Sequence, residues 1–214
     1  MGRIEVSPLP GCPSIRLGLI NGDFPTGPLP GDVMHAVLAE PAYWSLCWGS
    51  GLALAQLLLR STDWVRSKHV LDLGSGSGVV AIAAAMAGAA SVCACDTDAD
   101  ARLATSVNAS INAVSIDVFD SIPSERNIDM ILMADVLYDK ANLPLLTLAQ
   151  NSANEVLVAD SRITRLPDPS YTEIARIDAL TCPNLGEFDE FRTAHVFHWE
   201  RAHKPPPPDA AREL

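Results

Sequence analysis

The stretch that most constrains the fold is 70–78, where a short apolar run passes through Asp72 into a turn with three alternating glycines. The apolar run predicts a buried strand, and the apolar residues from Val79 to Ala87 predict a helix. A strand that enters a helix through such a turn presents backbone N–H groups and a helix N-terminus to a ligand. The stretch therefore predicts a nucleoside-binding loop, although a glycine-rich turn by itself is also found in purely structural positions.

The glycine spacing separates two kinds of nucleotide loop. A dinucleotide loop has the pattern G-x-G-x-x-G, whereas Gly78 comes one residue early here and Val79 takes the later position. Asp96 follows Gly78 by eighteen residues, close to the ~20 at which an acid is expected to bind ribose hydroxyls. We therefore expect a loop for S-adenosylmethionine and disfavour an NAD site.

Strand and helix patterns alternate from residue 69 onward. The sequence predicts strands at 69–73, 91–95, 115–118, 129–134 and 155–159, and helices at 78–87, 99–112 and 142–152. Two further strands are expected at 174–180 and 193–199, joined by the acidic loop 186–190. The alternation predicts an α/β fold whose parallel sheet is covered on both faces, and the last two strands predict an antiparallel hairpin at one edge.

The preceding part of the chain divides at about residue 40. Residues 1–40 are rich in proline and predict a loop-rich extension, with one short strand at 15–19 and a short helix from a cap at Asp32 through Leu38. Residues 41–200 are expected to form a single domain that begins with a helix at 51–60, and the tail 201–214 is expected to be disordered. Trp44 is expected to fill the core, whereas Trp48 is either a core residue or a lid over a flat adenosyl group.

Composition excludes several classes of partner. A formal net charge of −11 argues against binding to nucleic acid or to an anionic membrane, and it suits either a basic partner surface or simple solubility. The five cysteines contain no C-x-x-C pair and the histidines do not cluster with them, so we expect no disulfide framework and no metal site. With no apolar run near the ~20 residues of a membrane span and no signal or transit pattern, the expected compartment is the cytoplasm.

Acids follow the predicted strands at the edge where open parallel sheets bind ligands. Asp96 could accept hydrogen bonds from two vicinal ribose hydroxyls; the alternative role, a helix N-cap, better suits Thr97 or Asp98. An acid after the third strand could accept from the adenine amino group. Asp120 is preferred over Asp117 for this role because it falls beyond the strand end, and a plain surface acid is the alternative.

Asp135 ends the fourth strand, and Tyr138 follows three residues later. Reacting groups meet at such a position, although acids at strand ends also serve as caps. S-adenosylmethionine is a methyl donor, and an acceptor of its methyl group must reach this position. If that acceptor is a lysine amine, with an unperturbed pKa of ~10.4, a neighbouring carboxylate is a poor base because it stabilises the ammonium. A fixed carboxylate instead stabilises the positive charge that develops on the nitrogen. We therefore assign orientation and stabilisation to Asp135, pocket shaping to Tyr138 and the proton to water.

These motifs resemble those of class I (seven-β-strand) S-adenosylmethionine-dependent methyltransferases. Residues 70–78 are similar to their motif I, and Asp135-Val136-Leu137-Tyr138 matches the D-x-x-Y signature of the subgroup that methylates lysines on proteins. Over residues 15–200 the chain is similar to the electron-transfer-flavoprotein β-subunit lysine methyltransferases and their bacterial relatives, which are also described as nicotinamide N-methylases or as ribosomal-protein L11 methyltransferase-like. The resemblance implies a Rossmann-like doubly wound sheet of seven strands, in the order 3-2-1-4-5-7-6 with strand 7 antiparallel.

Two stretches depart from the family pattern. The family's Y-W-x-x-x-W-P-G-G-Q corresponds to 43–52, where Gly49-Ser50-Gly51-Leu52 replaces P-G-G-Q and a Gln that could touch cofactor or substrate is missing. The stretch 156–162 resembles V-L-x-G-D-P-x-R, but the Gly-Asp-Pro is Ala159-Asp160-Ser161. We expect cofactor binding to survive both changes, whereas substrate identity is put in doubt.

Together, the motifs and the resemblance imply a methyltransferase that uses S-adenosyl-L-methionine and N-methylates a lysine of a protein substrate, as a monomer. Alternatives are a small-molecule N-methyltransferase for a pyridine-like amine, which needs a closed pocket, and a non-catalytic cofactor-binding protein. The expected catalytic residues are Asp135 and Tyr138. The expected cofactor-binding residues are Trp48, Gly51, Asp72, Gly74, Gly76, Gly78, Asp96, Thr97, Asp120 and Ala134.

Overall fold

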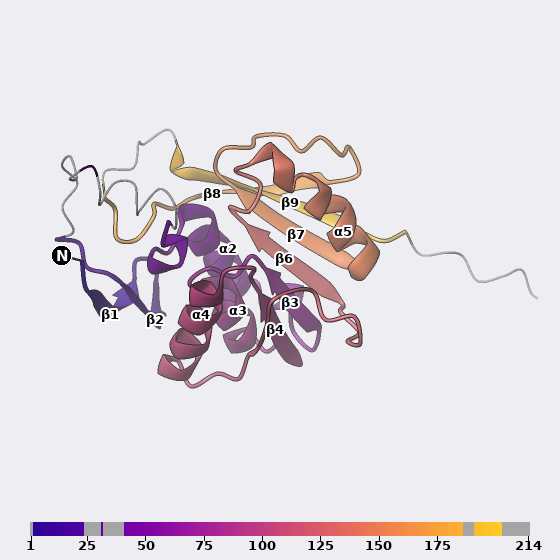
Figure 1. Ribbon diagram of the computed structural model, residues 1–214. Helices are drawn as coiled ribbons and strands as arrows, with labels where there is room; N and C mark the ends of the chain where they lie inside the picture. Colours follow the sequence, from indigo (N-terminus) through magenta and orange to yellow (C-terminus); the bar gives the residue numbers. More distant parts are fainter. Residues whose placement is uncertain (1, 24–30, 32–40, 186–190, 203–214) are drawn as a thin grey trace, which may run out of the picture.

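A seven-stranded sheet forms the centre of the computed structural model, which describes residues 2–23, 31, 41–185 and 191–202 (Figure 1). Its strands lie in the order β5-β4-β3-β6-β7-β9-β8, and β9 runs antiparallel to both of its neighbours. The expected Rossmann-like order, with an antiparallel seventh strand, is therefore confirmed. The strands are β3 (His69–Leu73), β4 (Ser91–Cys95), β5 (Asp117–Phe119), β6 (Met130–Ala134), β7 (Glu155–Asp160), β8 (Thr172–Asp178) and β9 (Thr193–Glu200).

Helices cover both faces of this sheet (Figure 1). Side chains alternate across a strand, so Val70 packs in one core cluster with α2 and α3, whereas its neighbour Leu71 packs in the other. The second cluster contains Leu146 of α5 together with Cys93 and Cys95, which are buried as expected. The helices are α2 (Gly49–Arg60), α3 (Val79–Met86), α4 (Ala99–Ile111) and α5 (Pro144–Ser152), with short 3₁₀ turns η1 (Tyr43–Ser45), η2 (Thr62–Trp64) and η3 (Lys140–Asn142).

The N-terminal residues form a hairpin, β1 (Ile4–Leu9) and β2 (Cys12–Ile20). The strand expected at 15–19 lies within β2, whereas the loop expected before it is a strand. The prolines indicated a loop, but β1 is an edge strand, where a proline costs few ladder hydrogen bonds. Ile15, Leu17 and Leu19 alternate along β2 and are buried in the core cluster of α2 and α3. The Asn108 side chain of α4 accepts from the Gly18 amide (2.8 Å) and so ties the hairpin to the main sheet's helices.

Several expected boundaries shift by a few residues. The third strand begins at Asp117 instead of residue 115, because pairing with β4 begins only there, opposite Cys93. The helix expected from residue 142 begins at Pro144, at a position that a helix start favours for proline. Predictions for 32–38, 186–190 and 203–214 lie outside the described residues. No helix within the described ranges is long and apolar enough to cross a membrane.

Candidate active site

A cavity of about 1020 Å³ lies at the carboxyl ends of β3, β4 and β6. This is the edge at which open α/β sheets bind ligands. The expected site residues that line it are Trp48, Gly74, Gly76, Asp96, Thr97, Asp120, Ala134, Asp135 and Tyr138. Gly51, Asp72 and Gly78 do not line it. The structure therefore brings most of the expected site together in one cavity.

Asp96 holds the glycine-rich turn open toward this cavity. Its Oδ2 accepts from the Gly76 amide (2.9 Å) and its Oδ1 accepts from the Asp98 amide (3.0 Å). Gly76 has a positive φ of 51°, and a Cβ built on it would meet no atom within 4 Å. Because a carboxylate offers about four lone-pair sites, Asp96 keeps acceptor capacity for the two hydroxyls of a ribose.

Gly51, Asp72 and Gly78, which we expected at the cofactor, lie outside the cavity lining and take part in packing and helix capping. A Cβ on Gly78 would lie 3.0 Å from the Thr105 Cα, which shows that this glycine lets α4 approach the turn. A Cβ on Gly51 would lie 3.1 Å from a methyl of Val79, between α2 and α3. Asp72 is 2% exposed, and its burial raises its pKa to about 7.

The two candidate adenine-binding acids lie in different surroundings. Asp120 lines the cavity together with Ser121 and Ile122. Asp117 forms an exposed ion pair with Arg126, with 2.7 Å between Oδ2 and Nη1. Only Asp120 is therefore placed to contact a nucleoside in the cavity.

Aromatic side chains surround the mouth of the cavity. Trp44, which we expected in the core, is half-buried and lines the cavity with Tyr43 and Trp48. The ring centroid of Tyr43 lies 5.8 Å from that of Trp48 and 5.8 Å from that of Tyr138. The Trp48 indole also donates to the Tyr43 carbonyl (3.0 Å). Sequence reasoning missed Tyr43 and Trp44, although the spacing Y-W-x-x-x-W was the available signal.

Asp135 follows β6 with a positive φ of 52°, an uncommon conformation for a residue other than glycine. Its carboxylate accepts from the Ser50 hydroxyl (2.5 Å, Oδ1) and from the Ser50 amide (3.0 Å, Oδ2). Burial raises its pKa to about 6, against the lowering effect of the Ser50 hydrogen bonds. The hydrogen bonds from Ser50 therefore favour the ionised carboxylate, which lies beside the aromatic mouth.

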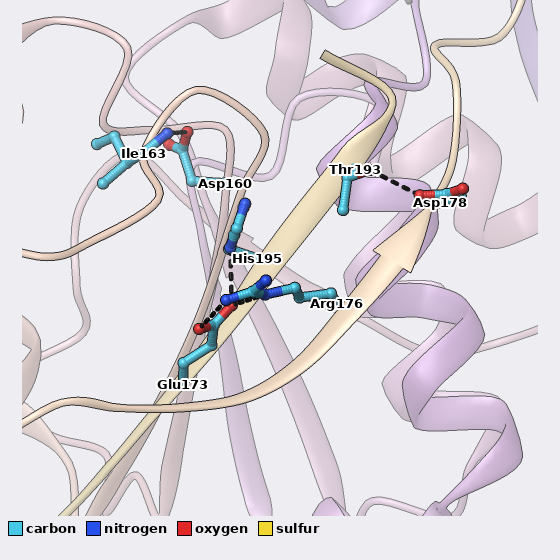
Figure 2. A network of polar contacts seen from close by, with 7 residues as sticks. All are labelled: Asp160, Ile163, Glu173, Arg176, Asp178, Thr193 and His195. Atoms are coloured by element: carbon cyan, nitrogen blue, oxygen red, sulfur yellow. Dashed lines mark hydrogen bonds and ion pairs between the residues drawn. The ribbon is translucent and has the colours of Figure 1, made fainter. Parts of the chain in front are cut away.

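The turn after β7 adds a cation to the cavity, which sequence reasoning missed as a site residue. Asp160 is 1% exposed, and its Oδ1 accepts from the Arg162 and Ile163 amides (2.8 and 2.9 Å). Figure 2 shows this turn beside β9, where His195 contacts Glu173 of β8 (2.7 Å). The anchored turn lets Arg162 line the cavity, with its guanidinium carbon 5.2 Å from the centroid of the Phe191 ring.

The cavity fits an adenosyl sulfonium compound. Acids that could accept from a nucleoside follow β4 and β5 and line the cavity, and the turn at Gly76 leaves space for a ligand. No group of three metal-ligating side chains occurs within the part of the chain that the structure describes.

Solved structures share this fold. A ribosomal protein L11 methylase from Lactobacillus delbrueckii subsp. bulgaricus is 23% identical, with a TM-score of 0.52 over 69% of this chain and 77% of that chain. TrmN from Thermus thermophilus is 22% identical, with a TM-score of 0.52 over 69% of this chain and 48% of that chain. The protein SMU.776, complexed with SAH, is 12% identical, with a TM-score of 0.55 over 92% of this chain and 55% of that chain. At these identities the likeness shows the fold alone.

Sequence comparison identifies the family. A search of curated proteins finds no match to the chain. The family model of ribosomal protein L11 methyltransferase (PrmA) matches residues 53–160, just over half of the chain, which includes the glycine-rich turn, Asp96 and Asp135. The chain therefore belongs to the ribosomal protein L11 methyltransferase (PrmA) family and is an S-adenosylmethionine-dependent methyltransferase.

Proposed function

We propose that this enzyme transfers a methyl group from S-adenosylmethionine to the side-chain nitrogen of a lysine in a protein substrate. The observation that carries the proposal is the Asp135 carboxylate, held by Ser50, in a cavity whose mouth is formed by exposed aromatic rings. The matched family is named for methylation of a ribosomal protein, and the D-x-x-Y motif resembles that of protein lysine methyltransferases. Both support a protein acceptor. The net charge of −11 is compatible with a basic protein partner.

The mouth suits the end of a lysine side chain. Tyr43 and Tyr138 are 47% and 56% exposed, so the rings face solvent as well as each other. Aromatic faces attract an ammonium and pack against a methylene chain. A small flat amine would instead need a pocket closed over Asp135, and the exposure of these two rings favours an open channel.

Bound S-adenosylmethionine supplies an activated methyl group, and the chain's own residues orient the acceptor. Asp96, Asp120 and the turn at Gly76 would hold the nucleoside, while Asp135 follows β6, the strand beside β3, at the same sheet edge. As positive charge develops on the acceptor nitrogen, the fixed Asp135 carboxylate stabilises it. Tyr138 shapes the channel. The lysine proton leaves to water, because the anionic Asp135 favours the ammonium and is a poor base for it.

Incubation of the protein with cell extract and methyl-labelled S-adenosylmethionine tests the proposal. We expect label in one or a few proteins, at a lysine identified by mass spectrometry. Label confined to small molecules would contradict the protein-acceptor assignment and favour a pyridine-like amine. No label at all, with cofactor binding intact, would favour a non-catalytic binding protein.

A variant of Asp135 tests the assigned role within the same assay. Asp135→Ala should bind S-adenosylmethionine within about threefold of the natural chain, yet lose about 100-fold or more in turnover, as seen when one group that stabilises transition-state charge is removed. Full turnover in Asp135→Ala with normal cofactor binding would exclude this role. Asp117→Ala is the matched control, because it removes a carboxylate that lies outside the cavity.

A further inference from the structure

Ser50 of α2 contacts the carboxylate of Asp135 twice. Its hydroxyl lies 2.5 Å from Oδ1, and its amide nitrogen lies 3.0 Å from Oδ2. Ser50 itself has no exposed surface. One buried residue, 85 positions away in sequence, therefore holds both oxygens of the acid at the reaction site.

The same contact caps α2. Trp48 is the N-cap residue of this helix and makes no side-chain cap hydrogen bond. The first amides are instead satisfied from elsewhere in the fold: Gly49 donates to the Thr181 hydroxyl (3.3 Å) and Ser50 donates to Asp135. A helix N-terminus favours a negative charge beside it. The end of α2 thus stabilises Asp135 in its ionised form.

The remaining neighbours of Asp135 have opposing effects. Burial and the charge of Asp160 favour the neutral acid, and Arg162 favours the carboxylate. The buried thiol of Cys47 also lies close enough for Asp135 to raise the pKa of that thiol, so it supplies no compensating positive charge. The hydrogen bond from the Ser50 hydroxyl lowers the pKa of Asp135 and is the main influence that opposes burial. Without that hydroxyl, the balance shifts toward the neutral acid.

We propose that Ser50 is a positioning residue for methyl transfer, which holds the Asp135 carboxylate ionised and in one orientation while leaving its remaining lone pairs for the acceptor nitrogen. The inference rests on the proposed methylation of an amine. Ser50 does not line the cavity, so it acts through Asp135. Its removal should therefore change the ionisation of Asp135 and the rate of transfer, but not cofactor affinity.

Ser50→Ala tests this, because it removes the hydroxyl and keeps the amide. In protein with ¹³C-labelled aspartate, we expect the carboxyl titration of Asp135 to move from about 6 upward by about one pH unit, the size expected for one hydrogen bond to a charged group. The acid limb of the methylation rate should move by the same amount, with turnover about tenfold lower well below pH 6 and the two proteins converging at alkaline pH. Ser50→Thr, which restores a hydroxyl, should recover most of the difference.

Thr181→Ala is the matched control, since it removes the other hydroxyl that caps α2 without touching Asp135. It should lower the melting temperature as Ser50→Ala does but leave the Asp135 titration in place. An unchanged titration and acid limb in Ser50→Ala, or an equal shift in Thr181→Ala, would overturn the proposal. If Ser50→Ala does not fold, Ser50→Gly removes the same hydroxyl and is read in the same way. The titration needs no acceptor, so failure of the proposed lysine methylation would be seen separately in the extract assay.

Discussion

The Asp72 carboxylate lies beneath the glycine-rich turn, and its Oδ2 accepts a hydrogen bond from the Ala81 amide 3.0 Å away. Ala81 lies in the first turn of α3, whose N-cap residue, Gly78, has no side chain to cap it. Asp72 therefore caps α3 from the preceding strand. The acid of this motif supports the loop that binds the cofactor and does not itself contact the cavity.

At acidic pH, where the buried carboxyl is uncharged, Asp72→Ala should destabilise the protein, because it leaves the buried Ala81 amide without its acceptor. The cost of such an unsatisfied buried group is about 1–3 kcal/mol, measurable as the free energy of unfolding in urea. Cofactor affinity should fall only indirectly, because Asp72 supports the glycine-rich turn and does not line the cavity. A variant as stable as the natural chain would show that this cap contributes nothing.

The same acid predicts an unusual pH dependence of stability. Burial raises the pKa of folded Asp72 to about 7, above the ~3.9 of an unfolded aspartate, so the folded state binds the proton more tightly. The stability that this group contributes is fully present below pH 4 and is lost as the pH rises toward 7, by about 1.4 kcal/mol per pH unit at most. Comparison of the natural chain with Asp72→Asn between pH 4 and 8 isolates this effect. A constant difference across that range would contradict it.

Asp96 should be essential for cofactor binding. Asp96→Ala removes the expected acceptor of the ribose hydroxyls and also frees the Gly76 amide that positions the turn. We expect the dissociation constant for S-adenosylmethionine, measured by calorimetry, to rise at least about tenfold. In the natural chain, S-adenosylmethionine should raise the melting temperature by mass action, and NADH should not. Stabilisation by NADH alone would reopen the dinucleotide interpretation.

The main sheet and the strand ends were predictable because they follow local rules. Alternating and continuous apolar runs located β3, β4, β6 and β7. Asp96 and Asp135 were recognised because ligands bind beyond the carboxyl ends of parallel strands, and both line the cavity. Such residues can be predicted from the apolar pattern and from their position after a strand. Neither observation requires knowledge of which distant element packs against the strand.

The residues that were misjudged depend on contacts between distant segments. The β1–β2 hairpin is buried because it packs against α2, α3 and α4. Its proline-rich sequence does not indicate which elements it will contact. Ser50 meets Asp135 across 85 positions. Asp72 and Gly78 carry a motif that correctly indicates a nucleoside loop, yet spacing cannot tell which members of a motif face the ligand and which support the turn.

Asp120 and Asp117 form a matched pair for testing recognition of the adenine. Asp120→Ala removes the acceptor that lines the cavity, so we expect the affinity for S-adenosylmethionine to fall about three- to tenfold, the value of one hydrogen bond. Asp117→Ala breaks only an exposed ion pair with Arg126, and such pairs contribute about 0–1 kcal/mol to stability. Its cofactor affinity should be unchanged. Equal losses in both variants would assign the effect to charge at a distance rather than to a contact.

Two substitutions of Tyr138, in the aromatic mouth, distinguish the contribution of its ring to acceptor binding from that of its hydroxyl. The ring contacts Tyr43 with 5.8 Å between centroids, and an aromatic face attracts an ammonium by about 0.5–2 kcal/mol. Tyr138→Phe should therefore keep most of the activity, whereas Tyr138→Ala should raise KM for the protein acceptor by about 3- to 30-fold and leave cofactor affinity unchanged. Steady-state kinetics with the acceptor identified from extract provide the measurement. If Tyr138→Phe loses as much as Tyr138→Ala, the hydroxyl and not the ring is what the acceptor requires.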